Sequence, residues 1–543
     1  MRQADLILID GRIVTLDTLV PEAQAMAISA GRVLALGTTT EMLALKGQQS
    51  RVIDLGGRMV LPGFQDTHIH LQDSGEDLRR SVELVDAETV EELQGFLREF
   101  AATHDRSWVM GTGWNAGLFS AANLDRHVLD LAVPDRPCFI LSSDAHNACL
   151  NSKGCEAVGL VKGIADPPNG HFVLDGDGVP SGLVYEDAVT WALDHMPPIT
   201  DEDYREGVKF AQALANRSGF TGILDASVKE RHVRVYADMD RAGELTLRIS
   251  ATARVDATED AQAALARVKA LRAHHQSPMF KVHSAKFFLD GVFENRTAAM
   301  IEPYQDAVGG NAALMFSREQ ILEMFPLFDA ARFQIHVHAI GDGAVRAALD
   351  GVEEAMRQNG RWPALHQIAH IQVIDPSDIP RFFALGAMAN IQPLWAQMEP
   401  SITDLVQPMI GPDRSQFIYA FRKLVDQGAP YTLSSDWNVS TLDPFLIMEV
   451  ACTRQAPGEP DDPPLLPDQR LTRQEALMGY TVNAARAAWN FDTCGSLATG
   501  KYADFIVVDR DILACDIYEL GETEVLLTVL EGREVYRAEG FTA

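Results

Sequence analysis

The chain has 543 residues, of which 47% are hydrophobic and 22% charged, a composition typical of a globular protein with two to four domains. A formal net charge of -30 at pH 7 disfavours nucleic acid and anionic membrane surfaces as partners. No uncharged apolar run is long enough to span a bilayer, and a signal peptide is not expected. The six cysteines show no C-x-x-C spacing, as is typical of a reducing compartment. We therefore expect a cytoplasmic protein.

Both ends of the chain predict short β-strands separated by turns. Residues 4–60 contain four apolar runs punctuated by turn residues such as Asp10-Gly11, and residues 503–536 have the same texture. Neither piece alone makes a good sheet. We therefore predict one small β-sandwich built from residues 1–62 and 491–543, with a larger domain of residues 63–490 between them.

The middle of the chain alternates strand patterns with amphipathic helix patterns. The predicted strands are one that ends near His68, followed by 222–225, 247–252, 280–288, 333–338, 366–371, 388–391 and 431–436. The predicted helices include Thr258–Arg272, with Thr258 as its N-cap, Arg318–Ala331, Gly343–Asn359 and Asp375–Leu385. Eight β/α repeats predict a closed parallel (β/α)8 barrel. A doubly wound open sheet is disfavoured because no Gly-rich phosphate loop follows any strand.

A long excursion of about residues 75–200 separates the first predicted barrel strand from the second. It contains a strand pattern at 138–141 and two clusters of proline and glycine. Its length exceeds that of an ordinary connection between a strand and a helix. We therefore predict an inserted subdomain at this point of the barrel.

His68 and His70 stand two residues apart at the end of the first barrel strand. Residues i and i+2 of a strand point to the same side, so both imidazoles would face one point. Two converging imidazoles are suitable ligands for a divalent transition metal. With fifteen histidines in the chain, however, one such pair can arise by chance.

Further candidate ligands stand near the carboxyl ends of later strands. They are Lys286 on the fourth strand, His338 on the fifth, His370 on the sixth and Asp436 on the eighth. The chemistry of a (β/α)8 barrel lies at this end of its strands. Together with His68 and His70, these residues predict a metal site. His336 lies deeper in the fifth strand, where it is expected to support a ligand.

Lys286 is the least obvious of these candidates, because a protonated amine repels a metal ion. Its neighbours Ala285, Phe287, Phe288 and Leu289 are apolar, and apolar surroundings lower the pKa of an amine. A neutral lysine can add CO2 and become a carbamate, whose two oxygens can bridge two metals. The alternative is an unmodified lysine beside one metal.

Several motifs, taken together, resemble those of the metal-dependent amidohydrolase superfamily, and closely those of its YtcJ-like, or amidohydrolase-3, branch. They are Leu61–His70, Lys286–Gly291, Arg296–Ala299, His338–Asp342, His370–Gln372, Ser435–Trp437, Gly495–Leu497 and Gly500–Asp504. The resemblance implies a distorted barrel, a β-sandwich made from both ends and an inserted segment. The chain departs from the family pattern at three positions: Ala369 stands where glutamate is usual, Val292 where serine is usual, and Trp395 where histidine is frequent.

The resemblance also implies roles for the candidate ligands. His68, His70 and Asp436 would hold one metal, His338 and His370 a second, and Lys286 would bridge them as a carbamate. Zinc is the expected ion, with manganese, iron and nickel as alternatives. A metal-bound hydroxide would attack the substrate, and Asp436 would carry the proton to the leaving nitrogen.

These roles imply a hydrolase that cleaves a C–N bond in a small molecule, most simply an amide such as an N-acyl amine, an N-formyl amine or a cyclic amide. Two alternatives keep the same fold, a mononuclear deaminase and an ester or lactone hydrolase. A third, from another class, is a metal-binding regulatory barrel without catalysis. The presence of Asp436 argues against this last reading, since a barrel that only binds metal needs no proton carrier.

Six residues are candidates for substrate contact: Trp114, His146, Asp290, Glu294, Arg296 and Trp395. The loops after barrel strands face the pocket, and Arg296 has the geometry to hold a carboxylate with two hydrogen bonds. A structural ion pair is its alternative. Trp114 and His146 in the insertion would close over an apolar substrate, and Trp395 would add an aromatic wall. Core packing is the alternative for these three. A homodimer is common among such barrels, but nothing in the sequence shows an interface.

Overall fold

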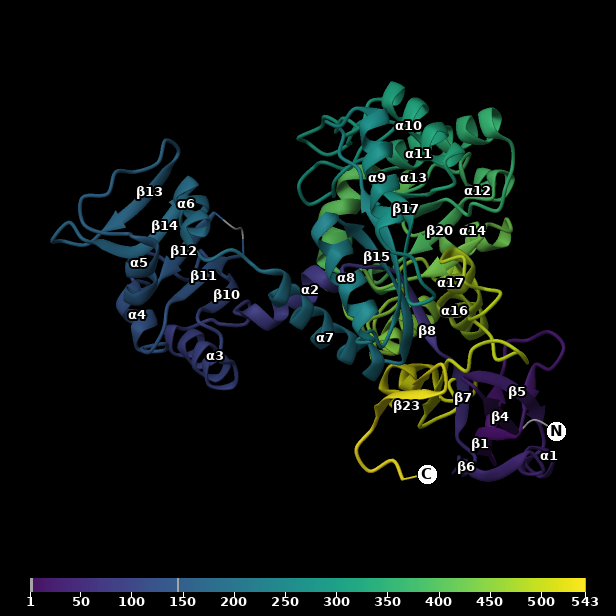
Figure 1. Cartoon of the computed structure of the whole chain (residues 1–543). Helices are drawn as coiled ribbons and strands as arrows, with labels where there is room; N and C mark the ends of the chain where they lie inside the picture. The colour runs from purple at the N-terminus through teal and green to yellow at the C-terminus, as the bar shows by residue number, and fades with distance from the viewer. Residues whose placement is uncertain (1–2, 144–145, 543) are drawn as a thin grey trace. The chain divides into compact units, whose positions relative to one another are not determined.

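The computed structural model describes residues 3–143 and 146–542, which form two compact units (Figure 1). One unit comprises Met1–Leu71 together with Ala211–Ala543, and it contains the barrel and both ends of the chain. The other is Gln72–Phe210. Within the described residues, no helix combines the length and the apolar character needed to cross a membrane. The domain boundaries at 62, 63, 490 and 491 stay predictions.

The first unit is organised around an eight-stranded sheet in the order β21-β20-β19-β18-β17-β16-β15-β8. Its strands are β8 (Phe64–Ile69), β15 (Phe220–Val228), β16 (Arg248–Arg254), β17 (Phe280–Phe288), β18 (Gln334–Ala339), β19 (Gln367–His370), β20 (Met388–Ile391) and β21 (Tyr431–Leu433). All seven hydrogen-bonded pairs are parallel. Each predicted barrel strand is therefore present, and the predicted barrel fold is confirmed.

The first and last strands of this sheet approach each other and nearly close the barrel. Near their carboxyl ends, the amide of Asp436 donates to the carbonyl of His68 at 2.8 Å, and the amide of His70 donates to the carbonyl of Trp437 at 2.9 Å. Buried Asp66 adds two contacts, because its carboxylate accepts from the amides of His68 and Ser435, both at 3.0 Å. These bonds hold the end of β8 beside the segment that follows β21.

Helices follow the strands, as the β/α alternation predicts. They are α8 (Glu230–Ala242), α9 (Ala261–His274), α10 (Arg318–Ala330), α11 (Asp342–Asn359), α12 (Ile379–Leu385), α14 (Phe421–Asp426), α15 (Pro444–Thr453), α16 (Arg473–Tyr480) and α17 (Val482–Ala487). Helix α10 begins with a reciprocal cap, in which the Ser317 hydroxyl accepts from the amide of Gln320 and the Gln320 side chain accepts from the amide of Ser317. The predicted N-cap Thr258 is wrong. Asp260 caps α9 instead, because its carboxylate accepts from the amides of Gln262 and Ala263.

The connection between β20 and α14 is irregular. It contains η1 (Pro393–Trp395), the π-helical turn η2 (Ser401–Val406) and α13 (Gln407–Ser415), which is kinked at Gly411. Gly411 has φ 76°, a conformation that costs glycine less than other residues. Two further short helices are η3 (Pro467–Gln469) and η4 (Ile517–Glu522).

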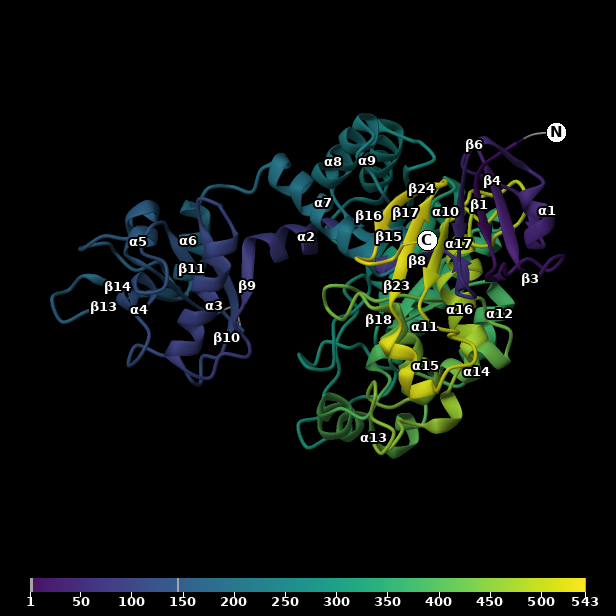
Figure 2. The ribbon, with the colours of Figure 1, turned by 90° about the horizontal axis from the view of Figure 1, so that it is seen from below.

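Strands from both ends of the chain build two further sheets in the first unit. One has the order β5-β4-β1-β6 and the other β24-β23-β22-β7-β2-β3. Their bounds are β1 (Ala4–Ile9), β2 (Arg12–Val14), β3 (Glu22–Ala23), β4 (Ala25–Ser29), β5 (Arg32–Gly37), β6 (Lys46–Asp54), β7 (Met59–Pro62), β22 (Phe505–Val508), β23 (Val525–Leu530) and β24 (Arg533–Arg537), with α1 (Thr39–Leu43) between β5 and β6. C-terminal β22 pairs antiparallel with N-terminal β7, and the yellow and purple strands lie side by side in Figures 1 and 2. One apolar core contains side chains from both sheets.

A buried charge cluster joins the barrel to these sheets. The guanidinium of Arg248, at the start of β16, donates to both carboxylate oxygens of Asp504 at 3.0 and 3.1 Å. It also donates to Glu531 at 2.6 Å. The side chains of Arg248 and Asp504 are each about 5% exposed. Because water hardly reaches these two charges, each must be compensated by the other.

The second unit has a six-stranded mixed sheet in the order β13-β14-β12-β11-β10-β9. The elements that lie in it wholly or in part are α2 (Leu71–Arg80), β9 (Ser81–Glu83), α3 (Val90–Thr103), β10 (Val109–Trp114), α4 (Arg126–Asp130), β11 (Cys138–Ser142), β12 (Asn147–Leu150), α5 (Ser152–Val158), β13 (Gly170–Leu174), β14 (Pro180–Glu186), α6 (Asp187–His195) and α7 (Asp201–Arg217). Two clusters of buried apolar side chains lie within this unit, and their packing explains why the segment forms a compact unit of its own. Helices α2 and α7 carry the chain into and out of it.

Candidate metal centre

The six predicted ligands come together at the carboxyl end of the barrel strands. His68 lies in β8 and His70 directly follows it, Lys286 lies near the end of β17, His338 in β18 and His370 at the end of β19. The strand register places Lys286 opposite His336, and His370 opposite Ala339. Asp436 stands three residues beyond β21, which is shorter than the predicted strand at 431–436.

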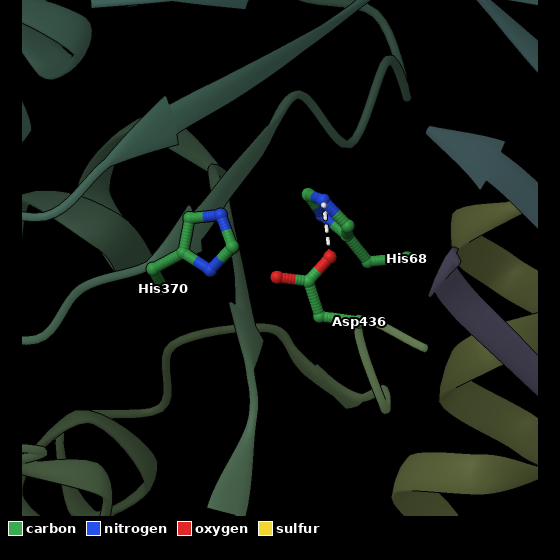
Figure 3. A group of neighbouring side chains, drawn as sticks. All are labelled: His68, His370 and Asp436. Carbon is green, nitrogen blue, oxygen red and sulfur yellow. Dashed lines mark ion pairs between the residues drawn. The ribbon is translucent and has the colours of Figure 1, made fainter. Parts of the chain in front are cut away.

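Three of these residues form the tightest group. One possible ligand atom each from His68, His370 and Asp436 lies within 4.8 Å of the others, and Figure 3 shows the Asp436 carboxylate facing the two imidazole rings. Nε2 of His68 lies 3.6 Å from Oδ1 of Asp436, and Nε2 of His70 lies 3.3 Å from the same oxygen. The amine of Lys286 lies 3.2 Å from Nε2 of His68. The ring centroid of His338 is 4.4 Å from that of His370.

Hydrogen bonds determine which nitrogen of His370 is free. Its Nδ1 lies 3.1 Å from the side-chain oxygen of Gln392. That amide cannot turn around, because its nitrogen donates to the Ser434 hydroxyl at 2.8 Å and to the Asn390 side-chain oxygen at 3.0 Å. Nδ1 of His370 therefore carries the proton, and Nε2 keeps its lone pair for a metal.

Two further contacts orient the other imidazoles. Nε2 of His338 lies 3.4 Å from the carbonyl of Gly291, so it donates there and leaves Nδ1 with a lone pair. Nδ1 of His68 lies 2.9 Å from Nε2 of His336. If His68 binds metal through Nε2, its Nδ1 is the donor in this contact. His336 thus contacts a candidate ligand from deeper in the barrel, as the sequence predicts.

Burial determines the charge state of the cluster. Burial lowers the pKa of His68 and His338 well below the ordinary value and that of His370 to about 4, so these imidazoles are neutral at pH 7. Burial also lowers the pKa of Lys286 to about 7. Burial alone would raise the pKa of Asp436. Its pKa is nevertheless lowered to about 2, because the carboxylate contacts His70 and interacts with the positive charges that His370, His70 and Lys286 can carry. The carboxylate is therefore ionised beside neutral nitrogen donors.

This set of side chains fits a divalent metal ion. Oδ1 of Asp436 is buried and has no hydrogen-bond donor among the described residues, because its approaches to His68 and His70 lack hydrogen-bond geometry. A buried carboxylate oxygen without a donor is costly unless a cation compensates it. Neutral imidazoles and a carboxylate are the ligands that zinc and related ions prefer.

Unusual backbone conformations accompany the cluster. His370, Ile371 and Asp436 have φ values of 77°, 47° and 57°, in the left-handed region that residues with a side chain rarely occupy. Such conformations cost about 1–3 kcal/mol each and persist where the surrounding contacts enforce them. The hydrogen bond from Asp436 to the carbonyl of His68 is one such contact.

A cavity of about 440 Å³ opens beside the cluster. Its walls include His68, His70, His338, His370 and Asp436, and the other lining residues are Phe288, Val292, Glu294, Ile340, Gln372, Trp395, Glu399, Ser401, Ile402, Tyr419 and Val439. Of the six predicted substrate contacts, Glu294 and Trp395 line this cavity. Two departures from the family pattern, Val292 and Trp395, line it as well.

Asp290 and Arg296 have structural partners instead. The buried Asp290 carboxylate accepts from the amides of Ala299, Ile340 and Gly341, which holds the loops after β17 and β18 together. Arg296 donates twice to Asp306, at 2.7 and 3.0 Å, and once to the carbonyl of Gly309. These contacts favour the structural ion pair over carboxylate binding by Arg296.

Trp114 and His146 belong to the second unit. Trp114 is 1% exposed and packs in an apolar core of that unit, which favours its packing role. His146 is exposed, and its Nδ1 lies 2.8 Å from a carboxylate oxygen of Glu186. Their predicted contact with substrate stays a prediction.

Several residues that line the cavity or contact the candidate ligands are not predicted as functional from the sequence. Gln392 directly follows β20 and is buried. A polar residue at the end of a barrel strand is the sequence signal that could have identified it. Glu399 and Tyr419 lie in the irregular connection after β20, where no periodic pattern exists. Their place in the cavity depends on tertiary structure alone.

Comparisons with known proteins agree with this architecture. The chain is 27% identical to the putative amidohydrolase YtcJ of Bacillus subtilis, over 94% of this chain and 96% of the relative. It is 26% identical to the N-substituted formamide deformylase of Arthrobacter pascens, over 99% of both chains. The crystal structure of an uncharacterized metal-dependent hydrolase from Pyrococcus horikoshii matches with a TM-score of 0.75 and 25% identity, covering 94% of this chain and 99% of that one. A model described as "Amidohydrolase family" matches residues 51–536. The chain therefore belongs to the amidohydrolase family, whose members and structural neighbours support a metal-dependent hydrolase.

Proposed function

We propose that this protein hydrolyses the C–N bond of an amide, and that its substrate is an N-formyl or N-acyl derivative of an amine. The observation that carries the proposal is the cluster of neutral imidazoles, an ionised carboxylate and a buried lysine beside one cavity. The formamide deformylase among its relatives supports the N-formyl amine in particular.

The proposed cofactor is zinc, held by His68, His70, His338, His370 and Asp436. A zinc ion held here would lower the pKa of water and polarise a carbonyl group. We further propose that Lys286 is a carbamate that links two ions. With its pKa lowered to about 7, a large share of Lys286 is the free amine at neutral pH. That neutral amine can add CO2 with release of one proton, and the product is an anionic carbamate.

Asp436 is the proposed proton carrier. Its Oδ1 accepts no hydrogen bond from the described residues, and Asp436 lines the cavity. During attack of water on the amide carbon, Oδ1 would accept the proton that the water loses and deliver it to the departing nitrogen. The C–N bond breaks, and the products are a carboxylic acid and an amine, which at pH 7 exchange a proton to give a carboxylate and an ammonium ion.

The lining of the cavity supports an apolar substituent on the amide. Phe288, Val292, Ile340, Ile402 and Val439 contribute apolar surface to its walls. A pocket that is mostly apolar and has a few polar groups at one end is typical of small-molecule sites. The polar end here is the metal cluster.

The test is a turnover assay on zinc-loaded protein with N-benzylformamide, N-benzylacetamide and benzyl acetate. We expect benzylamine to be released from at least one amide. Asp436→Asn should lower kcat by about 10²–10⁴-fold, the usual contribution of a positioned proton carrier. Asp413→Asn is the matched control, because Asp413 is exposed and does not line the cavity. Turnover of the ester alone, or amide turnover that Asp436→Asn leaves unchanged, would contradict the proposal.

A further inference from the structure

The cavity beside the cluster has glutamates on its wall in addition to the candidate metal ligands. Glu294 and Glu399 both line it, and no lysine or arginine does so among the residues that the structure describes. Neither glutamate makes an ion pair within those residues. The contact of the Glu399 carboxylate is with the hydroxyl of Ser401, at 3.3 Å.

Burial makes this arrangement costly for Glu399. It is half-buried, and desolvation raises its pKa because no cation compensates the charge. Glu294 is exposed and lines the same cavity. A wall with one half-buried and one exposed carboxylate attracts cations and repels anions, and its low-dielectric surroundings strengthen both effects.

The two glutamates act on the same part of the cavity. Both of their charges raise the pKa of the Tyr419 hydroxyl, in addition to the effect of burial. Tyr419 is itself a lining residue, and its backbone is fixed by bonds from its amide to the carbonyl of Gln372 and from Arg454 to its carbonyl. These two bonds define the backbone position of this lining residue.

Aromatic rings complete the surroundings of a cation. Trp395 and Tyr419 line the cavity, and the faces of such rings attract ammonium groups. The ring of Phe288, which also lines it, already has the amine of Lys286 over its face, 4.8 Å from the centroid. The Trp395 ring centroid lies 6.0 Å from that of His370, so the aromatic wall adjoins the metal cluster. Asp436, whose Oδ1 accepts no hydrogen bond from the described residues, lines the same cavity and marks its reactive end.

The one arginine that was a candidate for holding an anionic substrate is not available. Arg296 does not line the cavity, and its guanidinium is engaged by Asp306 and the carbonyl of Gly309. A substrate carboxylate placed in this cavity would therefore meet Glu294 and Glu399 without a compensating guanidinium.

We propose that the substrate is an amide that carries a positively charged amine at the end of an apolar group, and that Glu294 and Glu399 determine this specificity. The inference rests on the proposed amide hydrolysis at the same site. In this proposal the metal cluster binds the amide, and the apolar and aromatic wall contacts the apolar group of the substrate. The carboxylates of Glu294 and Glu399 bind its ammonium group. It also predicts that amides of amino acids with a free carboxylate are poor substrates.

The test uses three formamides with a cationic, a neutral and an anionic para substituent: N-formyl-4-(aminomethyl)benzylamine, N-formyl-4-methylbenzylamine and 4-(formamidomethyl)benzoate. We expect kcat/KM to fall in the order cation, neutral, anion, with about 10-fold or more between cation and anion at low ionic strength. The preference should weaken as salt is added, because salt screens partly exposed charges. Equal values for the three probes, or a preference for the benzoate, would overturn the proposal.

The double substitution Glu294→Gln/Glu399→Gln tests the assignment to these residues. It removes both charges with little change of shape, so the cation-to-anion ratio should fall by about 10-fold towards unity. Glu323→Gln is the control, because Glu323 is exposed on α10 and does not line the cavity. A ratio that stays the same in the double variant would overturn the assignment.

A binding measurement separates this inference from the proposed hydrolysis. Calorimetric titration of the three probes into Asp436→Asn protein reports charge preference without turnover. If the cation binds best and no probe is cleaved by the wild-type protein, the hydrolysis proposal fails and the charge preference stands. If the neutral probe is cleaved and the cation binds no better than the benzoate, the charge preference fails and hydrolysis stands.

Discussion

Replacing Gln392 with methionine should weaken metal binding without direct loss of a ligand. Gln392 is 1% exposed and does not belong to the predicted ligand set, but its side-chain oxygen holds Nδ1 of His370 at 3.1 Å. Methionine has a similar volume and no strong acceptor, so the His370 ring would lose the partner that fixes its tautomer and orientation.

The expected size of this effect follows from the contacts. Losing the partner of a metal-ligating imidazole typically costs 10–100-fold in metal affinity, or about 1.4–2.7 kcal/mol. The Ser434 hydroxyl and the Asn390 oxygen that Gln392 now contacts also bond to each other at 2.6 Å, so neither is left without a partner. The free energy of unfolding of the metal-free protein should therefore fall by only about 1–3 kcal/mol.

The assay is zinc affinity measured by competition with a chromophoric chelator, together with urea denaturation of the metal-free protein. Gln397→Met is the matched control, since Gln397 is also buried and donates to the carbonyl of Leu394 rather than to a candidate ligand. Zinc affinity should be unchanged in this control. The reasoning is refuted if Gln392→Met binds zinc as tightly as the wild-type protein while both remain folded.

Two further predictions concern stability. Arg248→Met leaves the buried Asp504 carboxylate without its cation and should lower the free energy of unfolding by about 3–5 kcal/mol in urea denaturation. Arg267→Met, which removes a more exposed pair with Glu259, should cost less than about 1 kcal/mol, and equal losses would contradict this account. Burial lowers the pKa of Lys281 to about 8, so the unfolded chain binds more protons between pH 8 and about 10.4. Stability should therefore contain a component that rises with pH in this window, by at most about 1.4 kcal/mol per pH unit, and Lys281→Met should remove it; an identical pH profile for the variant would contradict the assignment.

The barrel could be predicted from the sequence because its strands are buried on both faces and carry a strong local signal. In β17, seven of nine residues are buried, and the predicted range 280–288 matches the strand observed. The ligand positions follow from the same logic, since parallel strands bring their carboxyl ends to one side of the barrel. The positions of His338 and His370 near strand ends were therefore enough to predict them as metal ligands.

The remainder of the site depends on features without a local pattern. Asp436 reaches the cluster because β21 ends early and the chain turns with φ 57°, which no propensity predicts. Tyr419 and Glu399 lie in a connection of short, kinked helices, and their approach to the cavity is a result of long-range packing. Arg296 was a reasonable anion-binding candidate until the fold supplied Asp306 as its partner. The position of Arg296 in the sequence predicts that it lies in the loop after the fourth barrel strand, but it does not predict which residues Arg296 contacts there.

The most direct test of the central claim is the metal content of the protein. After equilibration with zinc and bicarbonate and removal of unbound ions, elemental analysis should find close to two zinc ions per chain. Lys286→Met should reduce this number, because it removes the proposed bridge, and His68→Ala/His370→Ala should bring it close to zero. One ion per wild-type chain would contradict the bridge. A wild-type protein that is folded and retains no metal under these conditions would contradict the metal centre itself.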